Sequence, residues 1–85
     1  MGVYRVLFRE SVFMDLRVIP KVDLEMIMEK ISALARNLRP SGAEKLTEKD
    51  RYRIRQGDYR VVYSIEDESL RVCVVKVGRR SSIYR

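Results

Sequence analysis

The apolar residues in the first half of the chain recur mainly at helical spacing, after an alternating segment at residues 3–8 that predicts a short strand. The first helix is expected to start at Ser11, a candidate cap, and to stop at Pro20. The second is expected to start near Asp23 and to stop at a turn over residues 39–42. Its apolar stripe returns every three or four residues and consists of Leu24, Ile27, Ile31, Leu34 and Leu38. Two adjacent amphipathic helices predict an α-hairpin.

After a polar loop at residues 41–50, the apolar period changes from that of a helix to that of a strand. Arg51, Arg53 and Arg55 alternate with Tyr52 and Ile54, and a tight turn follows at residues 56–58. Residues 59–65 alternate again, and residues 70–77 are almost continuously apolar, as in the middle of a sheet. One face of this sheet must cover the apolar stripes of the helices. The predicted fold class is therefore α+β in the order β-α-α-β-β-β, with an antiparallel sheet backed by an N-terminal helical hairpin in one domain over residues 1–85.

The same alternation decides where the arginines point. If the tyrosines of these strands face the helices, Arg53, Arg55 and Arg60 emerge together on the opposite, open face. The core-facing aromatic residues are then Tyr52, Tyr59 and Tyr63. Like charges placed side by side on a sheet destabilise it, so a shared arginine face favours an anionic ligand. The plainer alternative is a solvated basic surface that only aids solubility.

Charge and composition narrow the function classes. The 85 residues carry 18 Lys and Arg against 12 Asp and Glu, a net charge of +6, and residues 51–85 hold nine of these bases but four of the acids. There is no His and only one Cys, which excludes Ser-His and Cys-His nucleophiles, His-containing metal sites and Cys-rich zinc sites. No cofactor or metal is expected. No apolar run reaches the roughly 18 residues of a membrane span and no signal peptide is evident, so we expect a cytoplasmic protein with a polyanionic or acidic partner.

Three motifs in the second half carry a family resemblance. They are Tyr52-Arg53-Ile54-Arg55, Gly57-Asp58-Tyr59-Arg60-Val61-Val62-Tyr63, and Val77-Gly78-Arg79-Arg80 with a late Ile83-Tyr84-Arg85. In this order and spacing the chain resembles the RelE family of toxins, within the RelE/ParE toxin–antitoxin superfamily. The resemblance implies a microbial RNase-like fold and a type II toxin that enters the ribosomal A site and cleaves translated mRNA there. It also implies a cognate acidic, RelB-like antitoxin, with DNA contacted only through the toxin–antitoxin complex and no membrane partner.

The resemblance also implies a set of site residues. The catalytic candidates are Arg53, Arg60, Arg80 and Tyr84, and the candidates for binding RNA phosphates are Arg51, Arg55 and Arg79. The implied reaction is attack of a ribose 2′-OH on the adjacent phosphate, whose developing charge arginines can stabilise without a metal. Some family members have Lys at the positions of Arg53 and Arg55, and Arg is a poor base. Proton transfer is then left to Tyr84, to the ribosome or to the RNA itself.

Two other readings share the sequence features. A ParE-like toxin that poisons DNA gyrase would have the same fold without needing the late Arg80 and Tyr84. A nucleic-acid-binding module without catalysis, or a degenerate toxin, would keep the basic face alone.

Overall fold

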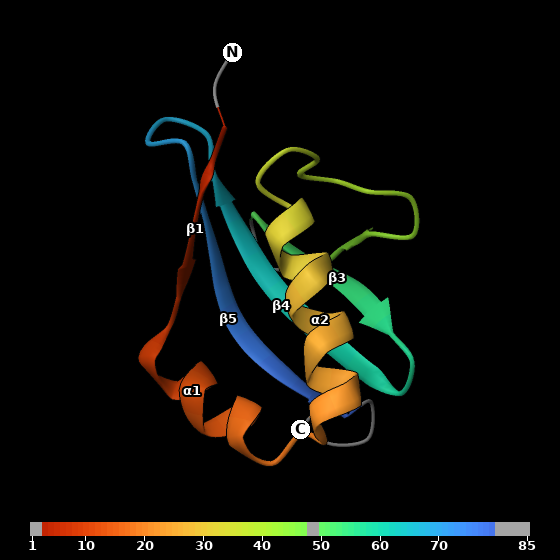
Figure 1. The fold of residues 1–85 in the computed structure, drawn as a ribbon. Coiled ribbons are helices and arrows are strands. Elements are labelled where there is room, and N and C mark those ends of the chain that lie inside the picture. Colours follow the sequence, from red (N-terminus) through yellow and green to blue (C-terminus); the bar gives the residue numbers. More distant parts are fainter. Residues whose placement is uncertain (1–2, 48–49, 80–85) are drawn as a thin grey trace.

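A computed structural model describes residues 3–47 and 50–79 of the chain (Figure 1). One strand and two helices come first, and four strands follow. In chain order the elements are β1 (Arg5–Phe8), α1 (Glu10–Arg17), α2 (Lys21–Ala33), β2 (Glu44–Lys45), β3 (Arg51–Gln56), β4 (Tyr59–Glu66) and β5 (Arg71–Arg79). The predicted α+β class and helical hairpin are confirmed, with one added short strand, β2, inside the expected polar loop.

The helix ends differ from those expected. Helix α1 starts at Glu10, after Arg9, whose side chain makes no capping bond, so Ser11 lies inside the first turn rather than at the cap. Helix α2 starts at Lys21 because Pro20 fixes the backbone in front of it. It stops at Ala33, short of the predicted end, because the Leu34 amide bonds back to the Ile31 carbonyl in a tighter, three-residue turn.

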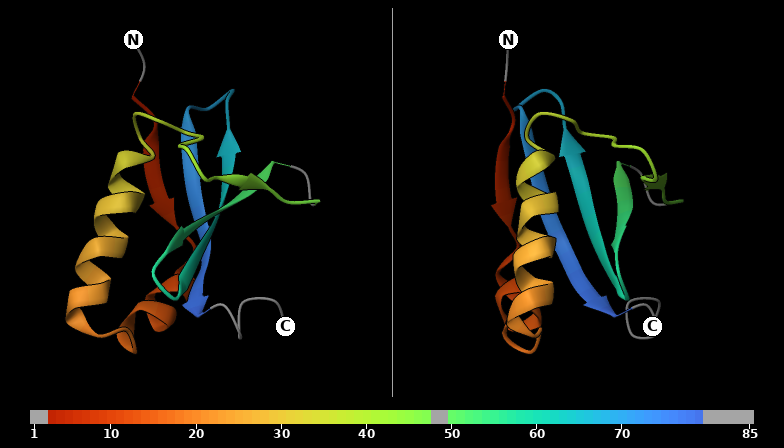
Figure 2. Two further views of the ribbon diagram at one scale, coloured as in Figure 1. Left: turned by 90° about the vertical axis from the view of Figure 1, so that its right-hand side faces the viewer. Right: turned by 45° about the vertical axis from the view of Figure 1, so that its right-hand side comes forward.

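The strands form one five-stranded sheet in the order β1-β5-β4-β3-β2. Strands β3, β4 and β5 pair antiparallel, as predicted, and the added β2 pairs antiparallel with β3, whereas β1 pairs parallel with β5, contrary to the prediction. The sheet is therefore mixed and not wholly antiparallel, since β1 and β5 run in the same direction. The helical hairpin lies on one side of the sheet, with α2 along it (Figure 2).

The core fills the space between α2 and the sheet. It includes the apolar stripe of α2 at Ile27, Ile31 and Leu34 and the inward residues of the last three strands, Ile54, Tyr59, Val61, Tyr63, Ile65, Val72, Val74 and Val77. The Tyr63 hydroxyl donates a hydrogen bond to the Leu38 carbonyl at 2.8 Å, and the Tyr52 ring stacks on Tyr63 at 5.8 Å between centroids. The predicted core positions of Tyr59 and Tyr63 are confirmed, and Tyr52 is half-buried beside them.

Helix α1 is joined to the end of β5 by hydrogen bonds. The Asp15 carboxylate accepts hydrogen bonds from the Val77 amide at 3.2 Å and the Lys76 ammonium at 3.3 Å. In this part of the chain, residues 3–47 and 50–79, we find no helix with the length and apolar character needed to cross a membrane.

Candidate functional site: an arginine cluster with a carboxylate

Three arginines come together on the sheet face that points away from α2. In the β3–β4 hairpin Arg55 lies directly opposite Arg60, and Arg53 lies opposite Val62, so all three side chains leave the same face. The turn between the strands is closed by Gly57, whose φ of 59° is a conformation that favours glycine. The predicted shared face is confirmed, and we call Arg53, Arg55 and Arg60 the arginine cluster.

Arg60 is less open than the sequence predicts. The residue is 6% exposed, the one charged or polar residue among those described that is buried. Its Nη1 donates to the Tyr59 carbonyl at 3.4 Å. Arg55, by contrast, is exposed. The arginine cluster therefore ranges from a buried cation on β4 to an accessible one on β3, and the buried guanidinium is held more rigidly than a surface side chain would be.

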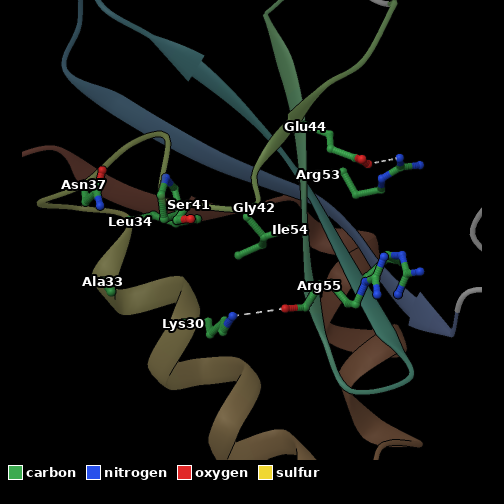
Figure 3. A pocket seen from close by; sticks show the side chains of 12 residues that line it. Lys30, Ala33, Leu34, Asn37, Ser41, Gly42, Glu44, Arg53, Ile54 and Arg55 are labelled. Carbon is green, nitrogen blue, oxygen red and sulfur yellow. Dashed lines mark hydrogen bonds and ion pairs between the residues drawn. The ribbon is translucent and has the colours of Figure 1, made fainter.

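Glu44 brings a carboxylate into the arginine cluster. The pairing of β2 with β3 sets Glu44 opposite Arg53, and its Oε1 accepts a hydrogen bond from Arg53 Nη2 (Figure 3). This hydrogen bond and the charge of Arg53 lower the pKa of the Glu44 carboxyl, and the charges of Arg55 and Arg60 lower it further. The lowered pKa keeps Glu44 ionised at neutral pH, and its side chain, which is 61% exposed, is accessible to a ligand.

The arginine cluster and Glu44 border a cavity of about 490 Å³. Its walls come from the second half of α2, from the turn at residues 40–42, and from β3 (Figure 3). Lys30 on α2 spans one side of it, where its Nζ donates to the Arg55 carbonyl at 3.1 Å. The cavity therefore has an apolar side toward the core and a cationic side at the arginine cluster.

The other sequence-predicted site residues lie elsewhere. Arg51 shares the face of the arginine cluster, opposite Ser64, but does not line the cavity. Arg79 lies on the core-facing side of β5, opposite Tyr59, with its guanidinium 5.7 Å from the centre of that ring, so it does not join the arginine cluster. Arg80 and Tyr84 lie outside the described residues.

Sequence reasoning did not single out Glu44. The residue stands in a polar loop with no periodicity, and its neighbour Arg53 is nine positions away. A lone acid in a loop carries no local signal, because its role comes from the pairing of a two-residue strand. Among residues 3–47 and 50–79, no group of three or more His, Cys, Asp or Glu side chains could hold a metal ion.

This arrangement suits chemistry at a phosphate. Fixed guanidinium groups can stabilise the negative charge that develops on a phosphate under attack. An ionised carboxylate beside them can accept a proton from a hydroxyl. The described residues thus bring together a charge-stabilising set and a proton acceptor at the mouth of one cavity.

Comparisons with known proteins match this chain to toxins of type II toxin–antitoxin systems. Residues 6–84 match the family model of the ParE toxin of the type II toxin–antitoxin system parDE. A curated relative, Toxin RelE of Mycobacterium tuberculosis, is 55% identical over 31 residues, which is 36% of this chain and 32% of that protein. The match thus spans about a third of the length of that relative.

Solved structures of RelE proteins superpose over nearly the whole chain. The RelE–RelB complex of Pyrococcus horikoshii is 28% identical, covers 94% of this chain and 98% of its own, and has a TM-score of 0.80. The isolated Escherichia coli RelE toxin is 27% identical, with coverages of 95% and 90% and a TM-score of 0.80. The RelBE2 toxin–antitoxin complex of M. tuberculosis is 26% identical, with coverages of 94% and 100% and a TM-score of 0.79. With its motifs, its fold and the family match over residues 6–84 in agreement, the chain belongs to the RelE/ParE superfamily of type II toxin–antitoxin toxins.

Proposed function

We propose that this toxin is a ribosome-dependent endoribonuclease that cleaves translated mRNA in the A site and so inhibits translation. The observation that carries the proposal is the position of Glu44 against the arginine cluster at the mouth of the cavity. The similarity to RelE toxins supports it. In this proposal the protein acts in the cytoplasm and needs neither a cofactor nor a resident metal.

The proposed reaction is a transesterification within the RNA. The ribose 2′-oxygen attacks the adjacent phosphorus, an O2′–P bond forms, and the P–O5′ bond breaks. The products are a 2′,3′-cyclic phosphate and a 5′-hydroxyl. The 2′-OH proton passes to the Glu44 carboxylate, and the leaving 5′-oxygen receives a proton from Tyr84. Arg55 and Arg60 stabilise the charge on the pentacovalent phosphorus, with Arg80 completing the set.

Arg53 has a different task from Arg55 and Arg60 in this scheme. Its hydrogen bond to Glu44 keeps the carboxylate ionised and fixes its direction. A lowered pKa makes Glu44 a weaker base, but it ensures that nearly every molecule holds the acceptor form at neutral pH. The scheme gives the proton of the 2′-OH to a carboxylate, whereas the sequence left that role to Tyr84, the ribosome or the RNA.

The proposed protein partner is an acidic, RelB-like antitoxin. Relatives from P. horikoshii and M. tuberculosis were crystallised with RelB or within a RelBE complex. The net charge of +6 favours a negatively charged partner. DNA would be contacted only through the toxin–antitoxin complex, with Arg51 and Arg79 as further phosphate contacts of the toxin on the ribosome.

Induced expression without antitoxin tests the function. We expect growth arrest and RNA ends that map only within translated mRNA, with no cuts when the purified chain meets mRNA without ribosomes. Arg60→Ala should lower the cleavage rate by about 10²–10³, as for removal of one charge-stabilising group. Arg36→Ala, at an exposed arginine beyond the end of α2, is the matched control and should remain fully toxic. Full toxicity of Arg60→Ala would contradict the site.

A gyrase poison is the second candidate, because the family model that matches residues 6–84 is that of ParE toxins. It predicts DNA breaks, induction of the SOS response and intact mRNA. Normal growth on full expression would instead favour a binding module without catalysis, or a degenerate toxin. The same induction experiment therefore separates all three readings.

A further inference from the structure

We infer that the cavity beside the arginine cluster is a nucleoside subsite, which holds the base and ribose of the nucleotide whose 2′-OH attacks. The inference rests on the proposed function for the direction of the RNA, but the binding of a nucleotide can be tested without cleavage. The ligand class is a ribonucleoside 3′-phosphate within an unpaired RNA strand.

The size and walls of the cavity suit a base better than a bare anion. Its volume of about 490 Å³ falls in the range of small-molecule sites, well above the need of one phosphate. Leu34 and Ile54 are almost fully buried behind the cavity, so the accessible apolar surface comes from Ala33, which is exposed, and Pro40, which is half-buried. The Ala33 and Pro40 side chains give apolar contacts that the face of an unstacked base can cover.

Polar groups at the cavity wall can read the edge of a base. The Asn37 amide, which can donate and accept, and the Ser41 hydroxyl line it on the side of α2 and the following turn. Lys30 lines the same side from α2, and its ammonium donates a hydrogen bond to the Arg55 carbonyl on β3. Such a mixture of an apolar floor and a few polar groups gives orientation and selectivity to a bound ring.

The cavity is continuous with the reactive groups. Arg55, Arg60 and Glu44 line it as well, so a base inside it is joined by a ribose to a phosphate at the arginine cluster. The ribose then lies between the base and that phosphate. Glu44 lines the cavity together with Arg55 and Arg60 and is the proton acceptor. This order, base, then 2′-OH, then phosphate, assigns the cavity to the nucleotide on the 5′ side of the cleaved bond.

Binding of mononucleotides by the full chain tests the subsite. The probes are the four ribonucleoside 3′-monophosphates and inorganic phosphate, followed by nuclear magnetic resonance. We expect phosphate to shift signals of Arg55 and Arg60, and at least one nucleotide to shift Ala33 and Gly42 as well. That nucleotide should bind at least about tenfold more tightly than phosphate, as contact with one base would provide.

A pair of neighbouring substitutions separates the base from the anion. Ala33→Phe places a ring in the cavity from an exposed helix position, and should remove the tenfold advantage while leaving phosphate affinity unchanged. Ser32→Phe adds the same ring one position away, where the side chain does not line the cavity, and should change neither. Ala33→Phe should also alter which nucleotide precedes the cut in translated mRNA.

Two results would overturn the subsite: nucleotides that bind no tighter than phosphate, or an Ala33→Phe chain that keeps the tenfold advantage. Either can occur while the wild-type chain still cleaves translated mRNA, in which case the proposed function stands and the subsite fails. Tight nucleotide binding without mRNA cleavage would instead support the subsite and contradict the proposed function.

Discussion

At the scale of single residues, Glu44 can be distinguished from Tyr84 as the base by the pH profile. The pKa of the Glu44 carboxyl is lowered by Arg53, so the acceptor form is already complete at neutral pH. Single-turnover cleavage of ribosome-bound mRNA should therefore be independent of pH between about 6 and 8, where neither an ionised Glu nor a neutral Tyr titrates. A tyrosine can act as the base only after it loses its own proton, so a tyrosine base would instead give a rate that rises about tenfold per pH unit, in step with the phenolate fraction.

Substitution of Glu44 gives the matching measurement. Glu44→Gln keeps a side chain that can accept from Arg53 but cannot take up a proton, and should slow single-turnover cleavage by about 10²–10⁴. Glu25→Gln, at an exposed position on α2, is the control and should leave the rate unchanged. An unaltered rate in Glu44→Gln would remove the carboxylate from the mechanism and return the proton to Tyr84 or the ribosome.

Tyr63 is a residue whose hydroxyl matters to stability. Burial raises its pKa to about 12, and the neutral hydroxyl donates to the Leu38 carbonyl. A folded pKa above the unfolded value of about 10 means that this stability is present below pH 10 and is lost as pH rises toward 12. Tyr63→Phe keeps the ring and should lower the free energy of unfolding by about 1 kcal/mol at pH 7. It should also reduce the loss of stability as pH rises from 10 toward 12.

Urea unfolding at several pH values measures both effects. Tyr59→Phe serves as the control, because its ring lies beside the Arg79 guanidinium rather than near Leu38, and it should preserve the alkaline loss. The same alkaline loss in Tyr63→Phe and the wild type would show that another group is responsible.

At the scale of elements, helix α1 supplies a hydrogen-bond acceptor for a backbone amide of β5 that has no acceptor within the sheet formed by the described residues. Strand β1 pairs with β5 only as far as Val74, so beyond that point the edge of β5 needs another acceptor for the Val77 amide. Asp15 provides it and is well shielded, with a side chain 16% exposed, whereas its partner Lys76 is 49% exposed. The structural value of Asp15 therefore lies mainly in the bond to the backbone.

Two substitutions separate these contributions. Asp15→Ala should lower the free energy of unfolding by about 1–3 kcal/mol, because it leaves a backbone donor without its acceptor. Lys76→Ala removes only a surface ion pair and should cost less than about 1 kcal/mol. Amide exchange at Val77 should accelerate in the first variant alone. Equal losses in both variants would assign the stability to the ion pair.

The elements also show what the sequence can and cannot predict. The period of two placed Arg53, Arg55 and Arg60 on one face, because strand geometry and a two-residue turn fix the register locally. Nothing local signals that β1 lies parallel to β5, since their residues are 66 positions apart at Arg5 and Arg71. Glu44 was missed for a different reason, because its place depends on the pairing of two residues in a polar loop that has no apolar period.

At the scale of the whole molecule, the positive charge is concentrated where the proposed RNA site lies. Residues 51–85 carry nine bases and four acids, and they include all three members of the arginine cluster. Attraction of this region to phosphates does not depend on the RNA sequence, and it adds to the affinity that base contacts in the cavity contribute. Binding to a single strand should therefore depend on salt even where cleavage cannot occur.

A 2′-O-methylated RNA strand, which lacks the attacking hydroxyl, tests this charge in isolation. Fluorescence anisotropy in increasing KCl should show log affinity falling linearly with log salt, by about 0.7 for each phosphate neutralised. Arg55→Gln should reduce the slope by about 0.7, since it removes an exposed cation of the arginine cluster without opening the core. Arg36→Gln removes the same charge from the far end of α2 and should leave the slope unaltered. If both variants reduced the slope equally, net charge rather than the arginine cluster would be what attracts RNA, and the site would have to be sought elsewhere on the surface.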